Sequence, residues 1–284
     1  MMSQLSIGVI LDSFRKPFPE AMDIAQKLGV QGLQVYATKG DMAPENLVGQ
    51  KRRDFLQMVK DHGLVISALC GDLGHGFDKP DLNPGLIERS KLILDMAREL
   101  ETDIVTTHIG VVPDDKNDPR YQIMLDACGE LAAYADQLGA HFAIETGPET
   151  AVVLREFLDN LHSTGVAVNM DPANFAMVTK DDPVQAVYTL QKSIVHTHAK
   201  DGVNLKPCNP EDIYSEMDHG AWDSEPAFKE LPLGQGAVDF PAYLKALEEI
   251  GFKGFLTIER EVGGNPAADI KLAADYLRQI ITTY

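Results

Sequence analysis

The stretch Ile194-Val195-His196-Thr197-His198-Ala199-Lys200-Asp201 begins with apolar and β-branched residues and ends with ionisable ones. The apolar start predicts a buried strand. His196, His198 and Lys200 share one face of it, because successive side chains of a strand alternate between faces. Two imidazoles on one face are costly to bury without partners. They are either a hydrogen-bonded core pair or the catalytic end of a strand with one histidine as a metal ligand; carboxylates from elsewhere in the chain would favour the second interpretation.

Outward from this stretch, one pattern recurs along the chain. A segment with apolar residues at helical spacing is followed by a short turn, usually with glycine, and then by a run of β-branched and apolar residues. Glycine just past a helix is the expected C-terminal cap. The pattern predicts eight strands that alternate with helices, at residues 5–10, 33–36, 64–70, 103–108, 140–145, 166–171, 194–201 and 254–259.

Continuous apolar strands that alternate with helices are typical of a parallel sheet. Eight such units predict an α/β fold, a single (β/α)8 TIM barrel. The structural alternative is a doubly wound open sheet. The first strand is followed by Asp12-Ser-Phe-Arg-Lys-Pro17, which is no phosphate-binding glycine loop, so the barrel is favoured. The chain has 284 residues and no linker long enough to separate domains, and we expect one domain over residues 1–284.

Composition argues against several classes of protein. A formal net charge of −18 disfavours nucleic-acid binding, which relies on clustered Lys and Arg. We find no signal peptide at the start and no apolar run of the ~18 residues that a membrane span needs. The three cysteines, Cys70, Cys128 and Cys208, are far apart and form no CxxC motif, which indicates a reducing compartment. We therefore expect a cytoplasmic protein without nucleic-acid or membrane partners.

Two connections are long. Residues 71–84 follow the third strand and carry Asp72, and residues 201–238 follow the seventh and carry Trp222, the only tryptophan. Long connections in compact domains are usually functional or disordered. In a barrel both would lie on the face where sites form, which makes Trp222 a candidate substrate contact.

Four late strands end in residues that can bind metal: Glu145, Asp171, His198 and Glu259. An isolated acidic residue at a strand end is usually solvated or salt-bridged. Carboxylates that are packed together at one end of a barrel would instead repel one another unless a cation neutralised them. Three oxygen ligands and one nitrogen ligand suit one divalent ion, with Mn2+, Mg2+ or Co2+ favoured and Zn2+ as an alternative.

The sequence around these residues resembles the xylose isomerase-like TIM barrels of the sugar phosphate isomerase/epimerase superfamily, which include ketose 3-epimerases, hydroxypyruvate isomerases, inosose dehydratases and, more remotely, endonuclease IV. The resemblance spans essentially the whole chain. It is specific for the superfamily and weak for the substrate. The segments that carry it are Ala143–Thr146, Asn169–Asn174, Val195–Asp201, Leu233–Asp239 and Leu256–Glu261.

The resemblance implies that Glu145, Asp171, His198 and Glu259 bind the metal. It also implies that Glu145 and Glu259 are the catalytic acid and base, which remove and return a proton next to the ketone through an enediolate. This is consistent with a metal that stabilises charge on the substrate oxygens and a carboxylate within reach of the proton.

The chain departs from the family's epimerases near the substrate. Asn174 stands where those epimerases often have a histidine. They also tend to have a glutamate about two residues after the position of Glu149, which is the nearest match here. Asn204 stands where their substrate-contacting arginine would be. These differences put the substrate in doubt more than the metal. We expect the substrate to contact His108, Asn174, Lys200 and Trp222. For His108 a structural role, and for Lys200 a pair with Asp201, are equally open.

The leading function is therefore a metal-dependent isomerase or epimerase of a keto sugar, free or phosphorylated. The alternative is a dehydratase of a keto-polyol such as an inosose, which would use the same metal and base to expel a β-hydroxyl group. An endonuclease IV-like nuclease is disfavoured by the acidic charge and by the few histidines at strand ends. A non-catalytic ligand-binding barrel is disfavoured by the full set of metal ligands. The expected partner is a small carbohydrate, and the sequence leaves open whether the chain forms a homo-oligomer.

Overall fold

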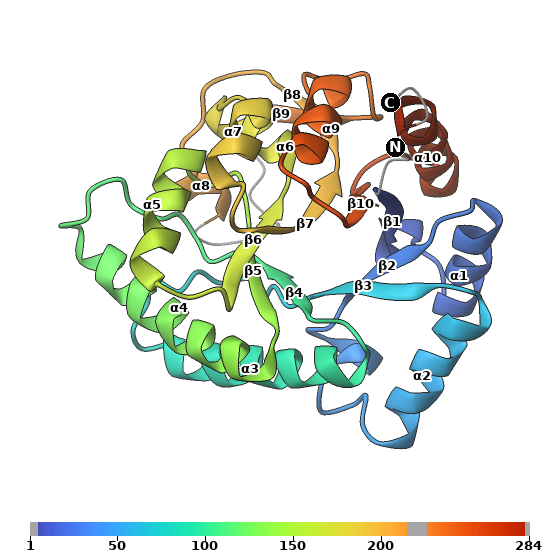
Figure 1. Cartoon of the computed structure of the whole chain (residues 1–284), viewed down its shortest axis with the longest axis horizontal. Helices are drawn as coiled ribbons and strands as arrows, with labels where there is room; N and C mark the ends of the chain where they lie inside the picture. Colours follow the sequence, from blue (N-terminus) through green and yellow to red (C-terminus); the bar gives the residue numbers. More distant parts are fainter. Residues whose placement is uncertain (1–4, 215–225, 282–284) are drawn as a thin grey trace.

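A computed structural model describes residues 5–214 and 226–281. Within these residues eight parallel strands close into a barrel in the order β1-β10-β7-β6-β5-β4-β3-β2, which confirms the predicted TIM barrel. Helices surround the strands (Figure 1). The barrel strands are β1 (Ser6–Ile10), β2 (Gly32–Tyr36), β3 (Val65–Cys70), β4 (Ile104–Thr107), β5 (His141–Glu145), β6 (Val166–Met170), β7 (Ile194–Ala199) and β10 (Phe255–Ile258).

The outward faces of the strands carry the large apolar side chains. Leu33, Val105, Phe142 and Leu256 are fully buried between the strands and the helices. The inward positions next to them in sequence are small or polar, and Gln34, Thr106, His196 and Thr257 form one hydrogen-bonded network inside the barrel. Strand alternation therefore gives this barrel an apolar outer layer and a polar interior.

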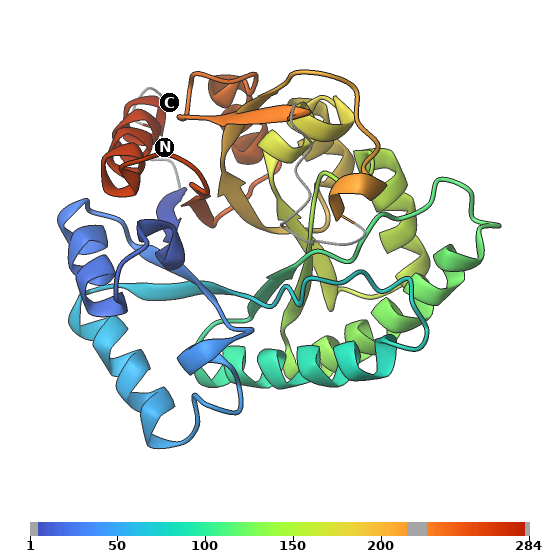
Figure 2. The ribbon, with the colours of Figure 1, turned by 180° about the vertical axis from the view of Figure 1, so that it is seen from behind.

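The outer helices follow the strands in sequence, as Figure 2 shows from behind. Several of them begin with a capping side chain and a proline in the first turn. Asp118 caps α4 and Asp182 caps α7, each followed by proline. The helices are α1 (Phe18–Lys27), α2 (Gln50–Asp61), α3 (Asn83–Glu99), α4 (Pro119–Leu138), α5 (Ala151–Leu161), α7 (Pro183–Leu190), α9 (Phe240–Glu249) and α10 (Pro266–Ile281).

The connection after β7 contains regular structure that the sequence did not predict. β8 (Asp201–Asn204) pairs antiparallel with β9 (Phe228–Leu231), and the short helix α8 (Glu211–Tyr214) lies between them in sequence. The connection after β6 forms a helical turn, α6 (Pro172–Asn174), which continues into a π-helical turn, η3 (Phe175–Thr179). Trp222 lies outside the described residues.

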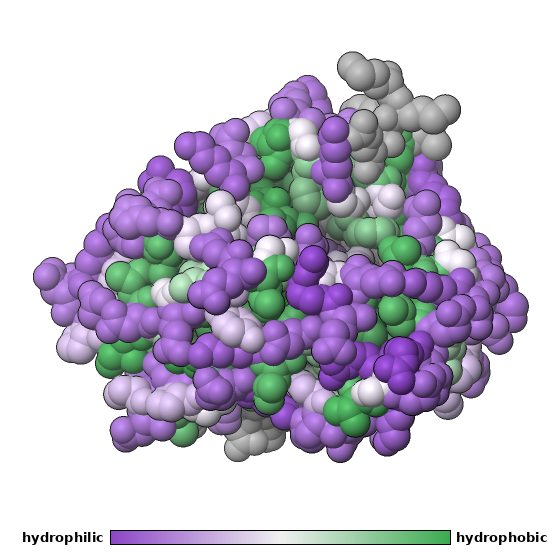
Figure 3. Space-filling view, turned by 60° about the horizontal axis from the view of Figure 1, so that its bottom comes forward, coloured by the Kyte–Doolittle hydropathy of each residue, from purple (hydrophilic) through white to green (hydrophobic). Residues whose placement is uncertain are grey.

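Polar side chains cover most of the face shown in Figure 3, with apolar residues between them. Among the residues that the structure describes, no helix combines the length and the apolar character needed to cross a bilayer.

Candidate metal centre

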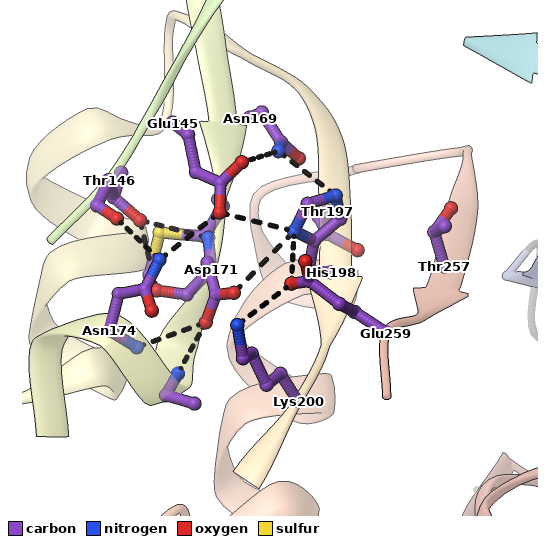
Figure 4. A network of polar contacts seen from close by, with 12 residues as sticks. Glu145, Thr146, Asn169, Asp171, Asn174, Thr197, His198, Lys200, Thr257 and Glu259 are labelled. Carbon is purple, nitrogen blue, oxygen red and sulfur yellow. Dashed lines mark hydrogen bonds and ion pairs between the residues drawn. The ribbon is translucent and has the colours of Figure 1, made fainter. Parts of the chain in front are cut away.

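Four predicted ligands meet at the carboxyl end of the barrel strands (Figure 4). Glu145 is the last residue of β5, and His198 lies near the end of β7. Asp171 and Glu259 were expected to be the last residues of their strands, but they come directly after β6 and β10. One ligand atom from each residue can be chosen so that all four atoms lie within 4.8 Å of one another, and all four residues are buried. This group could hold a metal ion.

The carboxylates converge on His198 Nδ1. That nitrogen lies 3.1 Å from Glu259 Oε2 and 3.5 Å from both Glu145 Oε1 and Asp171 Oδ2. Within residues 5–214 and 226–281, His198 Nδ1, Asp171 Oδ2 and Glu259 Oε2 are buried atoms without a hydrogen-bond partner. Buried polar atoms normally have a hydrogen-bond partner. Glu259 Oε2 is ion-paired with Lys200, and a cation bound at the point that the three atoms face would satisfy all of them.

Burial and charge oppose each other in this group. Burial raises the pKa of Glu145, but His198 and His108 lower it more, so that the net pKa falls below its ordinary value. Lys200 and His198 likewise overcome the burial that raises the pKa of Glu259. Burial lowers the pKa of His198, yet Glu145 and Glu259 raise it well above its ordinary value. The site thus keeps Glu145 and Glu259 ionised and attracts positive charge, either a proton on His198 or a metal ion in its place.

Gln34, which sequence reasoning missed, orients His198 from the opposite side of the barrel. Its amide nitrogen donates to Thr106 Oγ1 at 3.2 Å, so its Oε1 faces the histidines and lies 3.0 Å from His198 Nε2. Nε2 also lies 3.2 Å from the amide nitrogen of Asn169. Two donors do not bond, so we assign the Nε2 proton to Gln34 Oε1. This tautomer leaves the lone pair of Nδ1 directed at the carboxylates.

His196 lies two residues before His198 on the same face of β7, deeper in the barrel. Its Nε2 lies 2.9 Å from Gln34 Oε1 and 3.0 Å from Thr257 Oγ1. Burial, followed by the neighbouring His198, lowers the pKa of His196 well below its ordinary value. It is therefore a neutral, hydrogen-bonded core histidine, while His198 points into the candidate metal site.

Two asparagines hold Glu145. Asn169 donates to Glu145 Oε2 at 3.3 Å, and Asn174, a predicted substrate contact, donates to Glu145 Oε1 at 3.1 Å and to the Thr146 carbonyl at 3.2 Å. Asn174 therefore contacts the catalytic candidate directly. The signal that could have found this was its place three residues after Asp171, in the turn that Asp171 itself caps.

Lys200 binds carboxylates other than the neighbour that the sequence suggested. Its Nζ lies 3.3 Å from Glu259 Oε2 and 2.5 Å from Glu261 Oε2. The Asp201 carboxylate instead accepts hydrogen bonds from the backbone of residues 202, 234, 236 and 238. Burial lowers the pKa of Lys200, but Glu259 and Glu261 raise it well above its ordinary value. Lys200 is thus a fixed cation beside Glu259.

His108, another predicted substrate contact, lies beside Glu145. Its Nε2 lies 3.8 Å from Glu145 Oε1, its Nδ1 lies 2.9 Å from Asp72 Oδ2, and its ring packs against Tyr214 with centroids 5.2 Å apart. Glu149 is also buried, and Val112 N donates a hydrogen bond to its Oε2 at 3.1 Å. Burial raises the pKa of Glu149 to about 8.

A family model described as xylose isomerase-like TIM barrel matches residues 22–280. The chain belongs to this family.

Among curated proteins, this xylose isomerase-like chain is 23% identical to an uncharacterised protein of Methanocaldococcus jannaschii, over 75% of the chain and 70% of that protein. It is 29% identical to the rhizopine catabolism protein MocC of Rhizobium meliloti, over 51% of the chain and 44% of that protein.

Solved structures of the xylose isomerase-like barrel share its fold at low identity. The xylose isomerase domain protein of Planctomyces limnophilus has a TM-score of 0.79 at 23% identity, over 99% of this chain and 98% of the other. The "probable 3-DHS dehydratase" of Bacillus anthracis has a TM-score of 0.74 at 18% identity, over 96% and 99%. The 3-keto-D-glucoside 4-epimerase of E. coli has a TM-score of 0.73 at 15% identity, over 97% and 99%. The same barrel thus occurs in proteins named for isomerisation and for dehydration.

Proposed function

We propose that this protein is a divalent-metal-dependent isomerase or epimerase of a small keto sugar. We expect it to act without a nucleic-acid or membrane partner. One observation carries the proposal: buried ligand atoms of Asp171, His198 and Glu259, each without a hydrogen-bond partner, face one another beside Glu145 at the mouth of the barrel. Buried carboxylates that are packed together are costly unless positive charge neutralises them, which Lys200 does in part. Membership of the xylose isomerase-like family supports it.

Glu145, Asp171, His198 and Glu259 would hold the ion. When bound, it supplies Lewis-acid stabilisation of negative charge on the substrate oxygens. Mn2+, Mg2+ or Co2+ suits the oxygen-rich ligands best. The protein's own contribution is to keep the ligands deprotonated and oriented, with Gln34 bonded to His198 and the two asparagines bonded to Glu145.

The two glutamates are the proposed acid and base. They come from β5 and from the end of β10, and His198 Nδ1 lies between their carboxylates in the contact network. Their lowered pKa values keep both ionised at neutral pH. One glutamate takes the proton from the carbon next to the ketone, and the C–H electron pair becomes a C=C bond of an enediolate. A glutamate then returns the proton to carbon.

Metal content and turnover test this proposal together. Protein purified without chelator should contain about one divalent ion per chain by elemental analysis. His198→Ala should lose the ion, whereas His62→Ala, on the outer helix layer, should keep it. Turnover of free and phosphorylated ketoses should need the ion and should fall in Glu145→Gln and Glu259→Gln. A folded wild type that binds no ion on titration would overturn the proposal.

A keto-polyol dehydratase is the second candidate. The observation that favours it is His108 Nε2, a nitrogen 3.8 Å from Glu145 Oε1 that can protonate a departing hydroxyl group. The likeness to the Bacillus anthracis protein shows only a shared fold. Loss of water from a keto-polyol such as an inosose gives a conjugated product that absorbs ultraviolet light, and epimerisation does not. An ultraviolet assay with 2-keto-myo-inositol therefore separates the two functions.

A further inference from the structure

The Asp72–His108 pair lies beside the candidate metal centre but contributes no ligand to it. The two residues come from different barrel connections: Asp72 follows β3 and His108 follows β4. Asp72 Oδ1 accepts a hydrogen bond from Gly74 N at 2.8 Å, which leaves Oδ2 to contact His108 Nδ1 at 2.9 Å. Asp72 is therefore fixed by its own turn and holds the imidazole by one nitrogen.

The other nitrogen of His108 faces the site. Among residues 5–214 and 226–281, His108 Nε2 is a buried atom without a hydrogen-bond partner. Its distance of 3.8 Å from Glu145 Oε1 is too long for a hydrogen bond. The Tyr214 ring packs against the imidazole and limits its rotation. A substrate oxygen next to Glu145 would thus lie within reach of an imidazole nitrogen whose direction is already set.

This arrangement differs from that of the structural histidine in the same barrel. His196 Nε2 lies 2.9 Å from Gln34 Oε1 and 3.0 Å from Thr257 Oγ1, so it is satisfied within the protein. His108 instead combines a carboxylate on one nitrogen with an unsatisfied second nitrogen. A carboxylate that orients an imidazole, with the other nitrogen free for the substrate, is the general arrangement of an acid–base histidine.

We propose that His108 carries a proton between two neighbouring substrate oxygens, with Asp72 as its positioning residue, so that the enzyme moves a carbonyl group along its substrate. This rests on the proposed function and narrows it. Epimerisation moves only a carbon-bound proton. Carbonyl migration must also transfer a proton between two oxygens, and the proposed roles of the two glutamates do not include that transfer.

The steps balance as follows. In HO–CH–C=O, a glutamate takes the carbon-bound proton, the C–H pair forms the C=C bond, and the carbonyl oxygen takes a proton from His108 Nε2. The neutral imidazole then removes the proton of the other hydroxyl group, whose O–H pair becomes the new C=O bond. The C=C pair takes the proton from the glutamate at the former carbonyl carbon. Both residues return to their starting states.

Deuterium exchange and net conversion test the two proton transfers separately. Wild type and variants with Mn2+ are incubated in D2O with D-fructose, D-tagatose or 2-keto-myo-inositol. Proton NMR then measures deuterium at the carbons next to the ketone and conversion to the isomer. His108→Gln keeps a hydrogen-bond donor that cannot shuttle protons. It should retain exchange within about threefold and lose conversion by about 100-fold, the usual scale of one acid–base residue.

Asp72→Asn should lower kcat for conversion by about tenfold with KM unchanged, because orientation of the imidazole is lost while the substrate site stays. Added imidazole should restore conversion in His108→Ala. His75→Asn, an exposed histidine of the same connection, should behave as wild type.

Equal loss of exchange and conversion in His108→Gln, in a variant that melts like wild type, would overturn the role of His108 and leave the proposed function standing. So would conversion that survives at the wild-type rate. A wild type that shows neither exchange nor conversion with any of the three probes would contradict the proposed function itself, and the role of His108 with it.

Discussion

At the scale of single residues, Gln34 determines which nitrogen of His198 can bind a metal. Gln34→Leu should weaken Mn2+ binding about 10- to 100-fold, the usual effect of losing a hydrogen bond to a metal ligand. It should also cost about 1–3 kcal/mol of stability, because the Nε2 protons of His196 and His198 lose their acceptor. Calorimetric titration with Mn2+ measures the affinity. Gln122→Leu, exposed on α4, is the control, and equal affinities would contradict the assigned tautomer.

Glu149 should make stability depend on pH. Burial raises its pKa from 4.5 to about 8, so the folded protein keeps a proton that the unfolded chain releases between these values. Because the folded state binds more protons, stability falls as the pH rises from about 5 to 8 and levels off above. Glu149→Gln should remove this loss, a gain of about 3–5 kcal/mol at pH 8 and almost none at pH 4.

Urea unfolding of wild type and Glu149→Gln at several pH values measures this effect. Glu248→Gln, which is partly exposed near the end of α9, should leave the pH profile unchanged. A constant difference between Glu149→Gln and wild type from pH 4 to pH 8 would mean that the pKa of Glu149 is the same in the folded and the unfolded protein.

The candidate ligands were predictable residue by residue, because their positions follow from where each apolar run ends. Their supporting residues were not. Gln34 is one polar residue in the middle of an apolar strand, and its role depends on a histidine 164 positions away in sequence. Asp72 was visible only as an acidic residue in a long connection, because its contact with His108 joins two connections that meet only in the closed barrel.

At the scale of elements, Asp201 fastens the segment that precedes α9 to the β8–β9 hairpin. Its carboxylate accepts four backbone hydrogen bonds, from Gly202, Gly234, Gly236 and Val238. A Cβ at Gly236 would overlap that carboxylate, so glycine is required there. The ionisable end of residues 194–201 thus serves two purposes: Lys200 faces the candidate site, and Asp201 faces the segment that precedes α9.

Asp201→Asn should cost about 1–3 kcal/mol of stability, because an amide presents one acceptor oxygen where a carboxylate presents two. Hydrogen exchange at the amides of residues 234, 236 and 238 should accelerate before that of the barrel strands. Asp239→Asn is the matched control, because asparagine caps a helix as well as aspartate does. Unchanged exchange in Asp201→Asn would show that other contacts hold this segment.

The helices and strands themselves were largely predictable, because glycine caps and apolar periodicity are local signals. The pairing of β8 with β9 was not predicted. β8 and β9 pair across more than twenty residues and present no apolar alternation, so that their pairing is a tertiary event.

At the scale of the whole molecule, metal binding should stabilise the barrel, because the candidate ligands lie at the ends of four strands that must be folded to meet. A ligand at 100 times its dissociation constant adds about 2.7 kcal/mol, and Mn2+ should therefore raise Tm by about 5 °C relative to EDTA. Differential scanning calorimetry measures the shift. The double variant Asp171→Ala/His198→Ala should show none, and an equal shift in that variant would place the stabilising ion elsewhere.

By itself, the sequence determined the repeating strand–helix pattern, the closed barrel and the residues at the strand ends, because glycine caps, apolar runs and the residues that follow them are local features. The tertiary structure alone decided which side chains meet inside the barrel: Gln34 with two histidines, the two asparagines with Glu145, Asp72 with His108, and Lys200 with Glu261. The reason is physical. Closing a barrel brings strands together that are far apart in the chain, and a buried polar group is satisfied by whatever lies nearest in space.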